Sequence, residues 1–239
     1  MKTIACWRWA ACLLAFWATG TAMAQVAGFT VADAKNECFY YEQAERKAVT
    51  VGQQYPFGTT VETGRNSSLD LTLSEGNTFR LLARTKIAIT QDTRDPRLKI
   101  LRLETGSVDL QLDNMPKGEK LQVETPTAVC GAVGTRFAVT FESSDDKDLA
   151  GTRQSSFACD RGEVFVSSRF KVKEAVSTGR SMNVASVPAG SSFNATIHEG
   201  VENTFSDITV NRGKLTFQYG GEKGSTFVVA PEADDKPTR

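Results

Sequence analysis

The sequence has few of the residues that exported enzymes use for catalysis, and histidine is the scarcest of them. His198 is the single histidine among 239 residues, and we expect it at a strand end or turn. A Ser-His-Asp triad would have to use it, but no G-x-S-x-G elbow supplies a serine partner. The chain also lacks zinc-ligand spacings and phosphate-binding glycine loops. We therefore predict a protein that is not an enzyme and binds no metal or cofactor.

The chain also lacks an excess of charge of either sign and, after residue 24, any long apolar run. It has 28 basic and 28 acidic residues, and without Lys2 and Arg8 its net charge is −2. This balance offers no polycationic surface, so nucleic acid is not expected as a partner. A membrane-spanning helix needs about 20 apolar residues. We therefore expect no transmembrane segment in the processed protein.

The first 24 residues have the pattern of a secretory signal peptide. Two basic residues come first, an apolar run covers 10–17, and small residues then lead to Ala22-Met23-Ala24. This order predicts cleavage between Ala24 and Gln25, and a periplasmic or secreted bacterial protein. An uncleaved membrane anchor is the alternative, but the apolar run is short and breaks at Thr19-Gly20.

Alternation of apolar and polar residues dominates the rest of the chain. Leu69, Leu71 and Leu73 alternate with polar residues, and similar runs recur as far as Val229. Alternate side chains of a strand point to opposite faces, so each run predicts a strand with one buried side. Short turns rich in glycine separate the runs, which favours an all-β sandwich, barrel or β-solenoid. Residues 32–48 combine helix formers with strand formers and stay unassigned.

Four glycines occur at a regular spacing that could mark a structural repeat. Gly106, Gly134, Gly162 and Gly190 are each 28 residues apart. Repeats of ~20–50 residues are typical of solenoids. The residues that flank the four glycines match only loosely, however, and chance explains the spacing equally well.

An ordered set of short motifs lies between residues 55 and 166. Its characteristic residues are Thr63, Gly64, Gly76, Gly106, Pro126, Gly134, Thr135, Phe137 and Gly162. Each motif is weak alone, but their order is specific, and together they resemble the FecR domain of bacterial cell-envelope proteins. The resemblance implies a twisted β-solenoid-like or β-sandwich-like domain with extra C-terminal strands. We expect these residues to be structural, because glycines permit bends and Pro126 offers no N–H to a strand neighbour.

The resemblance and the signal pattern together divide the chain into five predicted segments. These are a signal peptide over 1–24, an N-terminal segment over 25–54, a FecR-like β domain over 55–166, a C-terminal β extension over 167–230 and a disordered tail over 231–239. The acidic run 145–148 lacks the spacing of a calcium-binding EF-hand, so we interpret it as a solvated loop.

Three cysteines follow the predicted signal peptide, and export would let a disulfide persist. An odd number allows at most one internal bridge. In the FecR-like arrangement Cys130 precedes the Gly134-Thr135 motif and Cys159 precedes the closing turn at Gly162. We expect strands 137–141 and 155–159 to pair antiparallel, and we predict a Cys130–Cys159 disulfide. Buried thiols are the alternative.

FecR regulators relay a signal from an outer-membrane iron–siderophore receptor to a sigma factor, and they use a cytoplasmic anti-sigma segment. Here we expect only a cleavable signal before the motifs, so control of a sigma factor is not expected. We predict a non-catalytic binding module of the cell envelope, with an envelope protein or a glycan as partner and a role in envelope signalling. A carbohydrate- or cell-wall-binding accessory protein is the alternative, motivated by N-terminal aromatics such as Tyr40 and Tyr41. A hydrolase with paired carboxylates is a third hypothesis.

Overall fold

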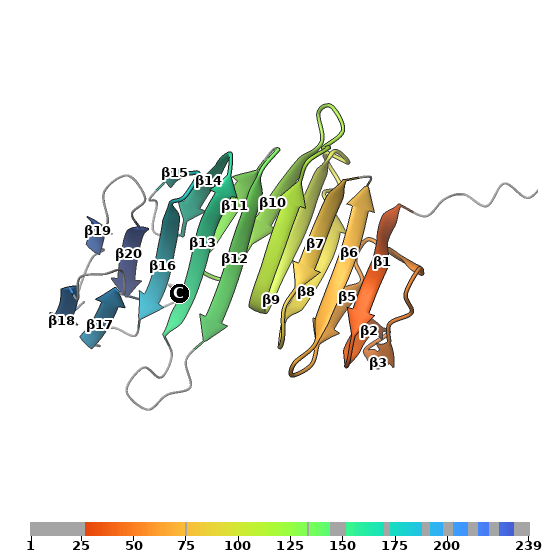
Figure 1. Ribbon diagram of the computed structural model, residues 1–239, viewed down its shortest axis with the longest axis horizontal. Coiled ribbons are helices and arrows are strands. Elements are labelled where there is room, and N and C mark those ends of the chain that lie inside the picture. The colour runs from red at the N-terminus through yellow and green to blue at the C-terminus, as the bar shows by residue number, and fades with distance from the viewer. Residues whose placement is uncertain are drawn as a thin grey trace, which may run out of the picture.

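A computed structural model describes residues 27–74, 76–132, 134–143, 152–169 and 173–187, and the backbone of four further strands between residues 192 and 231. Every regular element in these residues is a β-strand (Figure 1), which confirms the predicted all-β class. Within the same residues there is no helix that could cross a membrane. The predicted signal peptide with Ala24 and Gln25, the 145–148 loop, Gly190, His198 and the tail after residue 231 lie outside the described residues.

The strands follow one another closely along the chain. They are β1 (Gly28–Lys35), β2 (Cys38–Glu42), β3 (Glu45–Ala48), β4 (Gln54–Pro56), β5 (Thr60–Thr63), β6 (Ser68–Ser74), β7 (Asn77–Leu81), β8 (Lys86–Gln91), β9 (Leu98–Leu112), β10 (Lys120–Glu124), β11 (Ala128–Ala132), β12 (Arg136–Ser143), β13 (Arg153–Arg161), β14 (Glu163–Ser168), β15 (Lys173–Ser177), β16 (Ser181–Val187), β17 (Ser192–Ile197), β18 (Asn203–Thr209), β19 (Leu215–Tyr219) and β20 (Ser225–Pro231). Eighteen of them form one hydrogen-bonded sheet, and β17 pairs with β18.

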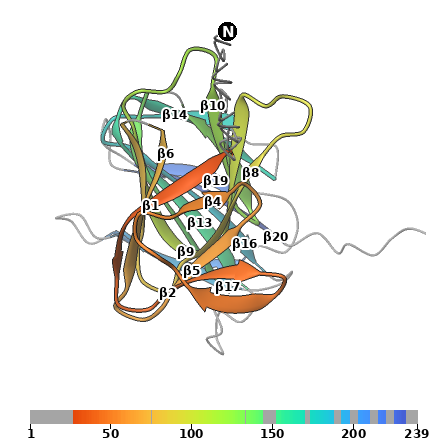
Figure 2. The ribbon, with the colours of Figure 1, turned by 90° about the vertical axis from the view of Figure 1, so that its right-hand side faces the viewer.

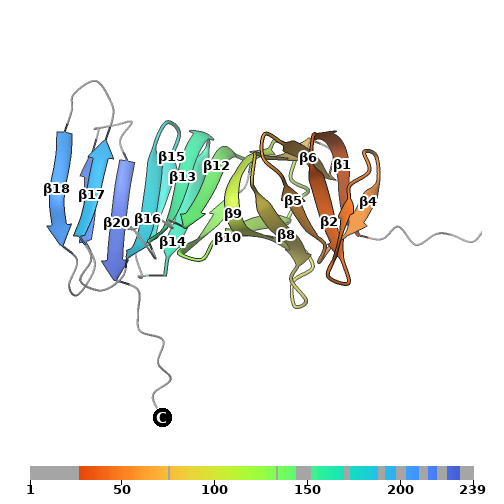
Figure 3. The same ribbon diagram turned by 90° about the horizontal axis from the view of Figure 1, so that it is seen from below.

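The strands of the large sheet form two layers that lie opposite each other across the interior (Figure 2). We call these layers the first face and the second face. In order of pairing, the first face consists of β4, β1, β6, β7, β9, β12, β13, β16, β20 and β19. The second consists of β3, β2, β5, β8, β9, β10, β11, β14 and β15. The described neighbours are antiparallel except for β9–β10 and β16–β20. Figure 3 shows the strands side by side along the long axis.

The inward residues of both faces form one apolar core. Phe79, Phe137 and Phe157 are fully buried in it, and the leucines of β6 pack beside them. Burial of each such side chain contributes about 1.5–3 kcal/mol. Because the apolar residues alternate along each strand, the period-two pattern of the sequence identifies this core.

Residues 28–48, most of which the sequence pattern does not assign, form β1, β2 and β3. Phe29 and Val31 of β1 and Cys38 of β2 are buried. At the start of β1, buried residues alternate with more exposed ones, as expected for a strand with one buried side. Asn36 directly follows β1 and has a positive φ of 59°, which asparagine tolerates. β1 pairs with β6 and β2 with β5, and packing therefore overrides the helix-forming composition.

Among the described strands, only β9 belongs to both faces. Its first part, from Leu98, pairs with β8 and β10, and its second part, from Gly106, pairs with β7 and β12. Gly106 has a φ of 90°, and a Cβ there would lie 2.4 Å from Thr85 Oγ1 and 2.5 Å from Thr85 Cα. A side chain at this position has no room, so glycine is required where β9 passes from one face to the other.

The bend in β9 also changes the edge at which the chain crosses between faces. Before β9 the chain crosses at residues 36–37, 64–67 and 82–85 on the edge near Thr85, and also through the loops on either side of β4. After β9 it crosses on the opposite edge, at 113–119, at Gly134, at Gly162 and at 178–180. The spacing of Gly106, Gly134 and Gly162 therefore marks crossing points with positive φ. It does not mark a repeated unit, because the first lies on a different edge from the other two.

The three cysteines are free, buried thiols, and the predicted Cys130–Cys159 bridge is not formed. The predicted antiparallel pairing is present, with Phe137 opposite Cys159. Cys130, however, lies on β11 in the second face, between Val123 and Val166, whereas Cys159 lies on β13 in the first face. The crossing at Gly134 places the two cysteines in opposite faces, because it sends the chain to the other face directly after β11.

Alanine substitutions at three glycines should separate the stability cost of a steric clash from the cost of a strained backbone φ. Gly106→Ala should lower the free energy of unfolding by about 2–4 kcal/mol, because it adds both a clash and a strained φ. Gly52→Ala, at a φ of 82° in open space, should cost about 1–2 kcal/mol. Gly131→Ala has neither feature and should be neutral or slightly stabilising. Urea unfolding followed by far-UV circular dichroism measures all three. Equal losses for Gly106→Ala and Gly52→Ala would contradict the contact with Thr85.

Thiol titration of residues 25–239 should find three free thiols in denaturant without reductant. In the native protein Cys130 should react slowly with an alkylating reagent, because full burial raises the pKa of its thiol and blocks access. A count of one thiol in denaturant without reductant would instead show an internal bridge. The same titration after reduction is the control and should give three.

Candidate functional site

The edge near Thr85 brings three crossings of the chain together with the bend of β9. They surround a cleft, which we call the crossover cleft. Its lining residues are Glu37, Glu62, Thr63, Gly64, Arg65, Arg84, Lys86 and Thr105. Two residues of the FecR-like motifs, Thr63 and Gly64, line it directly, and Gly106 follows the last of the lining residues.

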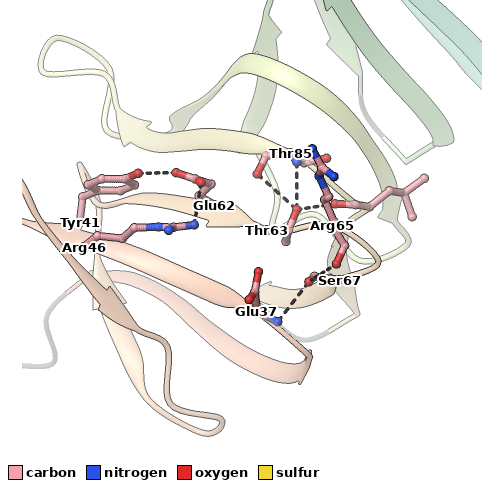
Figure 4. A network of polar contacts seen from close by, with 9 residues as sticks. Glu37, Tyr41, Arg46, Glu62, Thr63, Arg65, Ser67 and Thr85 are labelled. Carbon is pink, nitrogen blue, oxygen red and sulfur yellow. Dashed lines mark hydrogen bonds and ion pairs between the residues drawn. The ribbon is translucent and has the colours of Figure 1, made fainter.

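Two buried threonine hydroxyls hold the base of the crossover cleft. Thr63 Oγ1 accepts a hydrogen bond from Thr85 N at 2.9 Å and donates to Leu82 O (Figure 4). Thr85 Oγ1 accepts from Ser107 N at 2.9 Å and donates to Ser107 O at 3.0 Å. Each hydroxyl therefore satisfies one backbone N–H and adds a hydrogen bond to one backbone C=O at the crossings. Together they tie β5, β7, β8 and β9 into one rigid unit.

Main-chain contacts bring the crossing loops close to one another. Gly64 N donates to Glu37 O at 2.7 Å, and Arg84 N donates to Gly64 O at 3.0 Å. A Cβ on Gly64 would lie 2.7 Å from Glu37 Oε2, so glycine is needed for this approach. Arg84 itself has a φ of 55°, a left-handed conformation that costs a non-glycine residue about 1–2 kcal/mol.

Charged groups on the outer wall of the cleft are paired with one another. Glu62 accepts hydrogen bonds from Tyr41 Oη and from Arg46 at 3.0 Å (Figure 4). The hydrogen bond to Glu62 raises the pKa of the Tyr41 hydroxyl. Lys86 forms an ion pair with Glu104 at 2.7 Å. These contacts leave neither Glu62 nor Lys86 as an unbalanced charge.

Arg65 and Arg84 differ from the other charged residues of the cleft. Both side chains are exposed, and within the described part of the chain neither guanidinium forms an ion pair or hydrogen bond. Facing them in the lining is the carboxylate of Glu37, so the mouth carries two unpaired cations and one unpaired anion. A guanidinium can bind both oxygens of a carboxylate or phosphate at once. The arrangement is therefore suited to an acidic group presented by a partner.

The other residues of the FecR-like motifs lie away from the crossover cleft. Gly134, Thr135 and Gly162 come together on the opposite edge, where a Cβ on Gly162 would lie 2.8 Å from Thr135 Cγ2. Phe137 is buried in the core.

The last two motif residues lie in turns. Gly76, in the β6–β7 turn, has a φ of 78°, and a Cβ there would lie 2.4 Å from Asn114 Nδ2. Pro126 lies in the β10–β11 turn, where Thr125 N bonds to Ala128 O. Outside the crossover cleft, the motif residues therefore occupy turns, crossings and the core.

Most of the charged residues of the site were not predicted from the sequence, namely Glu37, Arg46, Glu62, Arg65, Arg84 and Lys86. The signal available for them was their position beside the Thr63-Gly64 motif and the β7–β8 turn. Tyr40 and Tyr41, which motivated the glycan hypothesis, point to opposite sides. Tyr40 packs inward against Tyr55, with ring centroids 4.7 Å apart. The two rings therefore do not form a shared platform for a sugar.

The two buried threonines of the motif set should respond differently to loss of the hydroxyl. Thr63→Val should lower the free energy of unfolding by about 1–3 kcal/mol, because Thr85 N and Leu82 O lose their partner. Thr63→Ser keeps the hydroxyl and should recover most of that loss. Thr135 Oγ1 is buried and has no hydrogen-bond partner among the residues that the structure describes, so Thr135→Val should be neutral or stabilising by up to about 1 kcal/mol. Urea unfolding measures the series, and equal costs at both positions would contradict the hydrogen bonds of Thr63.

Comparisons with known proteins identify a domain within the chain. The model of the family described as FecR protein matches residues 59–150. No curated protein matches the chain. Two crystal structures of a "putative anti-sigma factor" from Parabacteroides distasonis ATCC 8503, at 2.50 and 1.65 Å resolution, align with a TM-score of 0.43 and 15% identity. The alignment covers 66% of this chain and 66%, just under two thirds, of that one. The similarity to the FecR family therefore covers residues 59–150 of this chain.

Proposed function

We propose that this protein is a non-catalytic interaction module of the bacterial cell envelope, and that it binds an acidic segment of a partner protein at the crossover cleft. The observation that carries the proposal is the position of the cleft within the FecR domain. All lining residues except Glu37 fall inside residues 59–150. Domains of this family are associated with the envelope, and a signalling role there fits a binding module.

The crossover cleft has the properties of a preformed binding site. Its base is fixed by the Thr63 and Thr85 hydroxyls, so the backbone needs little ordering when a partner binds. Arg84 keeps a long charged side chain in a backbone conformation that glycine or asparagine would adopt more easily. Strain of this kind at a cleft supports a role for the side chain. The free guanidiniums of Arg65 and Arg84 supply the charge that an acidic segment would match.

The pattern of residues 1–24 supports a periplasmic or secreted location. A signal that ends at Ala24 would place the FecR domain outside the inner membrane. Signalling by this domain would then start from contacts made in the envelope.

Affinity capture with residues 25–239 as bait tests the cleft. The bait is compared with the double variant Arg65→Glu/Arg84→Glu and with the matched control Arg94→Glu/Arg97→Glu. The control makes the same change in charge on exposed residues of the β8–β9 loop, at the opposite edge. Envelope proteins retained by the unchanged bait and by the control should be lost at least tenfold on the cleft variant. Retention should also fall as salt is raised.

Two results would contradict the proposal. One is a set of retained proteins that is the same for both double variants. The other is specific binding on a glycan array that is lost when Tyr41 is replaced by alanine, which would favour the carbohydrate-binding alternative. Circular dichroism and urea unfolding of each variant show whether a loss of retention reflects the cleft rather than the fold.

A further inference from the structure

The outer side of the second face carries an exposed aromatic ring beside a hollow. Phe165, in the middle of β14, is 62% exposed although its neighbours Val164 and Val166 are buried. Gly131 lies directly opposite it on β11, and a Cβ built there meets nothing within 4 Å. The hollow is lined by Leu98, Lys120, Leu121, Gln122, Gly131, Ala132, Glu163 and Phe165. It shares no residue with the crossover cleft.

Two opposite charges flank this ring and hollow. Lys120 begins β10 and Glu163 begins β14, and both side chains are exposed. Within the described residues neither forms an ion pair. The patch therefore combines an apolar projection, an apolar depression, a cation and an anion on a single surface.

The register of the strands places these four features in two rows. Gln122, Gly131 and Phe165 lie side by side in one row across β10, β11 and β14. Both β10 and β14 run antiparallel to β11, so they run in the same direction. Lys120 and Glu163 each come two residues before their member of the first row. Lys120 and Glu163 therefore lie in a second row, which is displaced along the strands from the first row. The two charged residues are on β10 and β14, the strands on either side of β11.

We propose that two copies of the chain pair through this surface, about a two-fold axis that runs parallel to the strands and between β11 and β14. Rotation about this axis exchanges the positions of β11 and β14. It places Phe165 of each copy over Gly131 of the other, where the missing side chain leaves room for the ring. Face-to-face sheets pack about 10 Å apart, a separation that a phenylalanine side chain can fill.

The same rotation brings the charges together. It carries Lys120 of the second copy to the position above β15, which is the strand next to β14. Lys120 is then one strand away from Glu163 in the same row, within reach of its long side chain. By symmetry each contact occurs twice. Both the apolar and the charged contacts are satisfied by one operation, and this self-complementarity is the reason to assign a second copy rather than another protein.

Sedimentation equilibrium of residues 25–239 between about 1 μM and 1 mM tests the pairing. The unchanged protein should dimerise reversibly. Phe165→Ser should raise the dimer Kd at least about 30-fold, as expected for an anchoring aromatic that occurs twice in the interface. Gly131→Leu should raise it similarly, because it fills the hollow while the open surface leaves the monomer fold intact. Val51, in the loop between β3 and β4, is 54% exposed. Val51→Ser is the matched control and should leave the Kd unchanged.

Charge reversal tests the register directly. Lys120→Glu and Glu163→Lys should each raise the dimer Kd about 3- to 10-fold, and the double variant should return to within about threefold of the unchanged protein. The crossover-cleft variant Arg65→Glu/Arg84→Glu should dimerise normally, so failure of the cleft proposal leaves this one standing. The pairing is overturned if the unchanged protein stays monomeric at 1 mM, if Gly131→Leu dimerises normally, or if the double charge variant fails to recover.

Discussion

The close approach of β9 to Thr85 at Gly106 is the contact on which the rest of the structure depends. Because β9 passes from the second face to the first at this point, one strand ties both faces together through its own backbone. A Cβ at Gly106 would lie only 2.4 Å from the Thr85 hydroxyl, and this excludes every side chain. The hydroxyl of Thr85 then bonds to both backbone groups of Ser107, so the bend is fixed by hydrogen bonds as well as by space.

The position of the crossover cleft follows from this bend. A chain that crosses between two faces leaves backbone groups without strand partners, and these must be satisfied locally. Threonine hydroxyls do so at positions 63 and 85, and the same hydrogen bonds bring the crossing loops within contact of one another. Arg65 and Arg84, which we propose bind a partner, are therefore carried on a braced edge. Such an edge can hold the backbone at Arg65 and Arg84 in place without any ligand to organise it.

The sequence predicted the features that depend on local pattern and missed those that depend on pairing. Alternation located the strands and the core, because burial on one side imposes a period of two. It failed over most of residues 28–48, where helix-forming composition is overridden by pairing of β1 with β6 and of β2 with β5. The disulfide prediction failed for a related reason. The expected pairing of strands 137–141 and 155–159 is present, but Cys130 precedes the Gly134 crossing and therefore lies in the other face from Cys159.

In the candidate site, the sequence identified residues that shape the backbone but not the charged side chains. Thr63, Gly64 and Gly106 have recognisable positions in the motif set because each permits one particular backbone path. Arg65 and Arg84 have no such signature, since a surface arginine is ordinary until its neighbours are known. Their significance comes from the pairing of Glu62 with Arg46 and of Lys86 with Glu104, which leaves two guanidiniums unmatched. That balance is visible only when residues from four separate strands are placed together.

The bend in β9 also separates the two proposed binding surfaces. The half of the chain before β9 supplies the three crossings at the edge that holds the cleft, whereas β9 and the half after it build the outer surface around Phe165. A partner at the cleft and a second copy at the Phe165 surface would therefore occupy different parts of the molecule. A dimer would then present two clefts in a fixed relation to each other. A partner with two acidic segments could bind both, and the second contact would form at a high effective concentration. Such a dimer could respond to clustering of its partner in the envelope without any change in the fold of either copy.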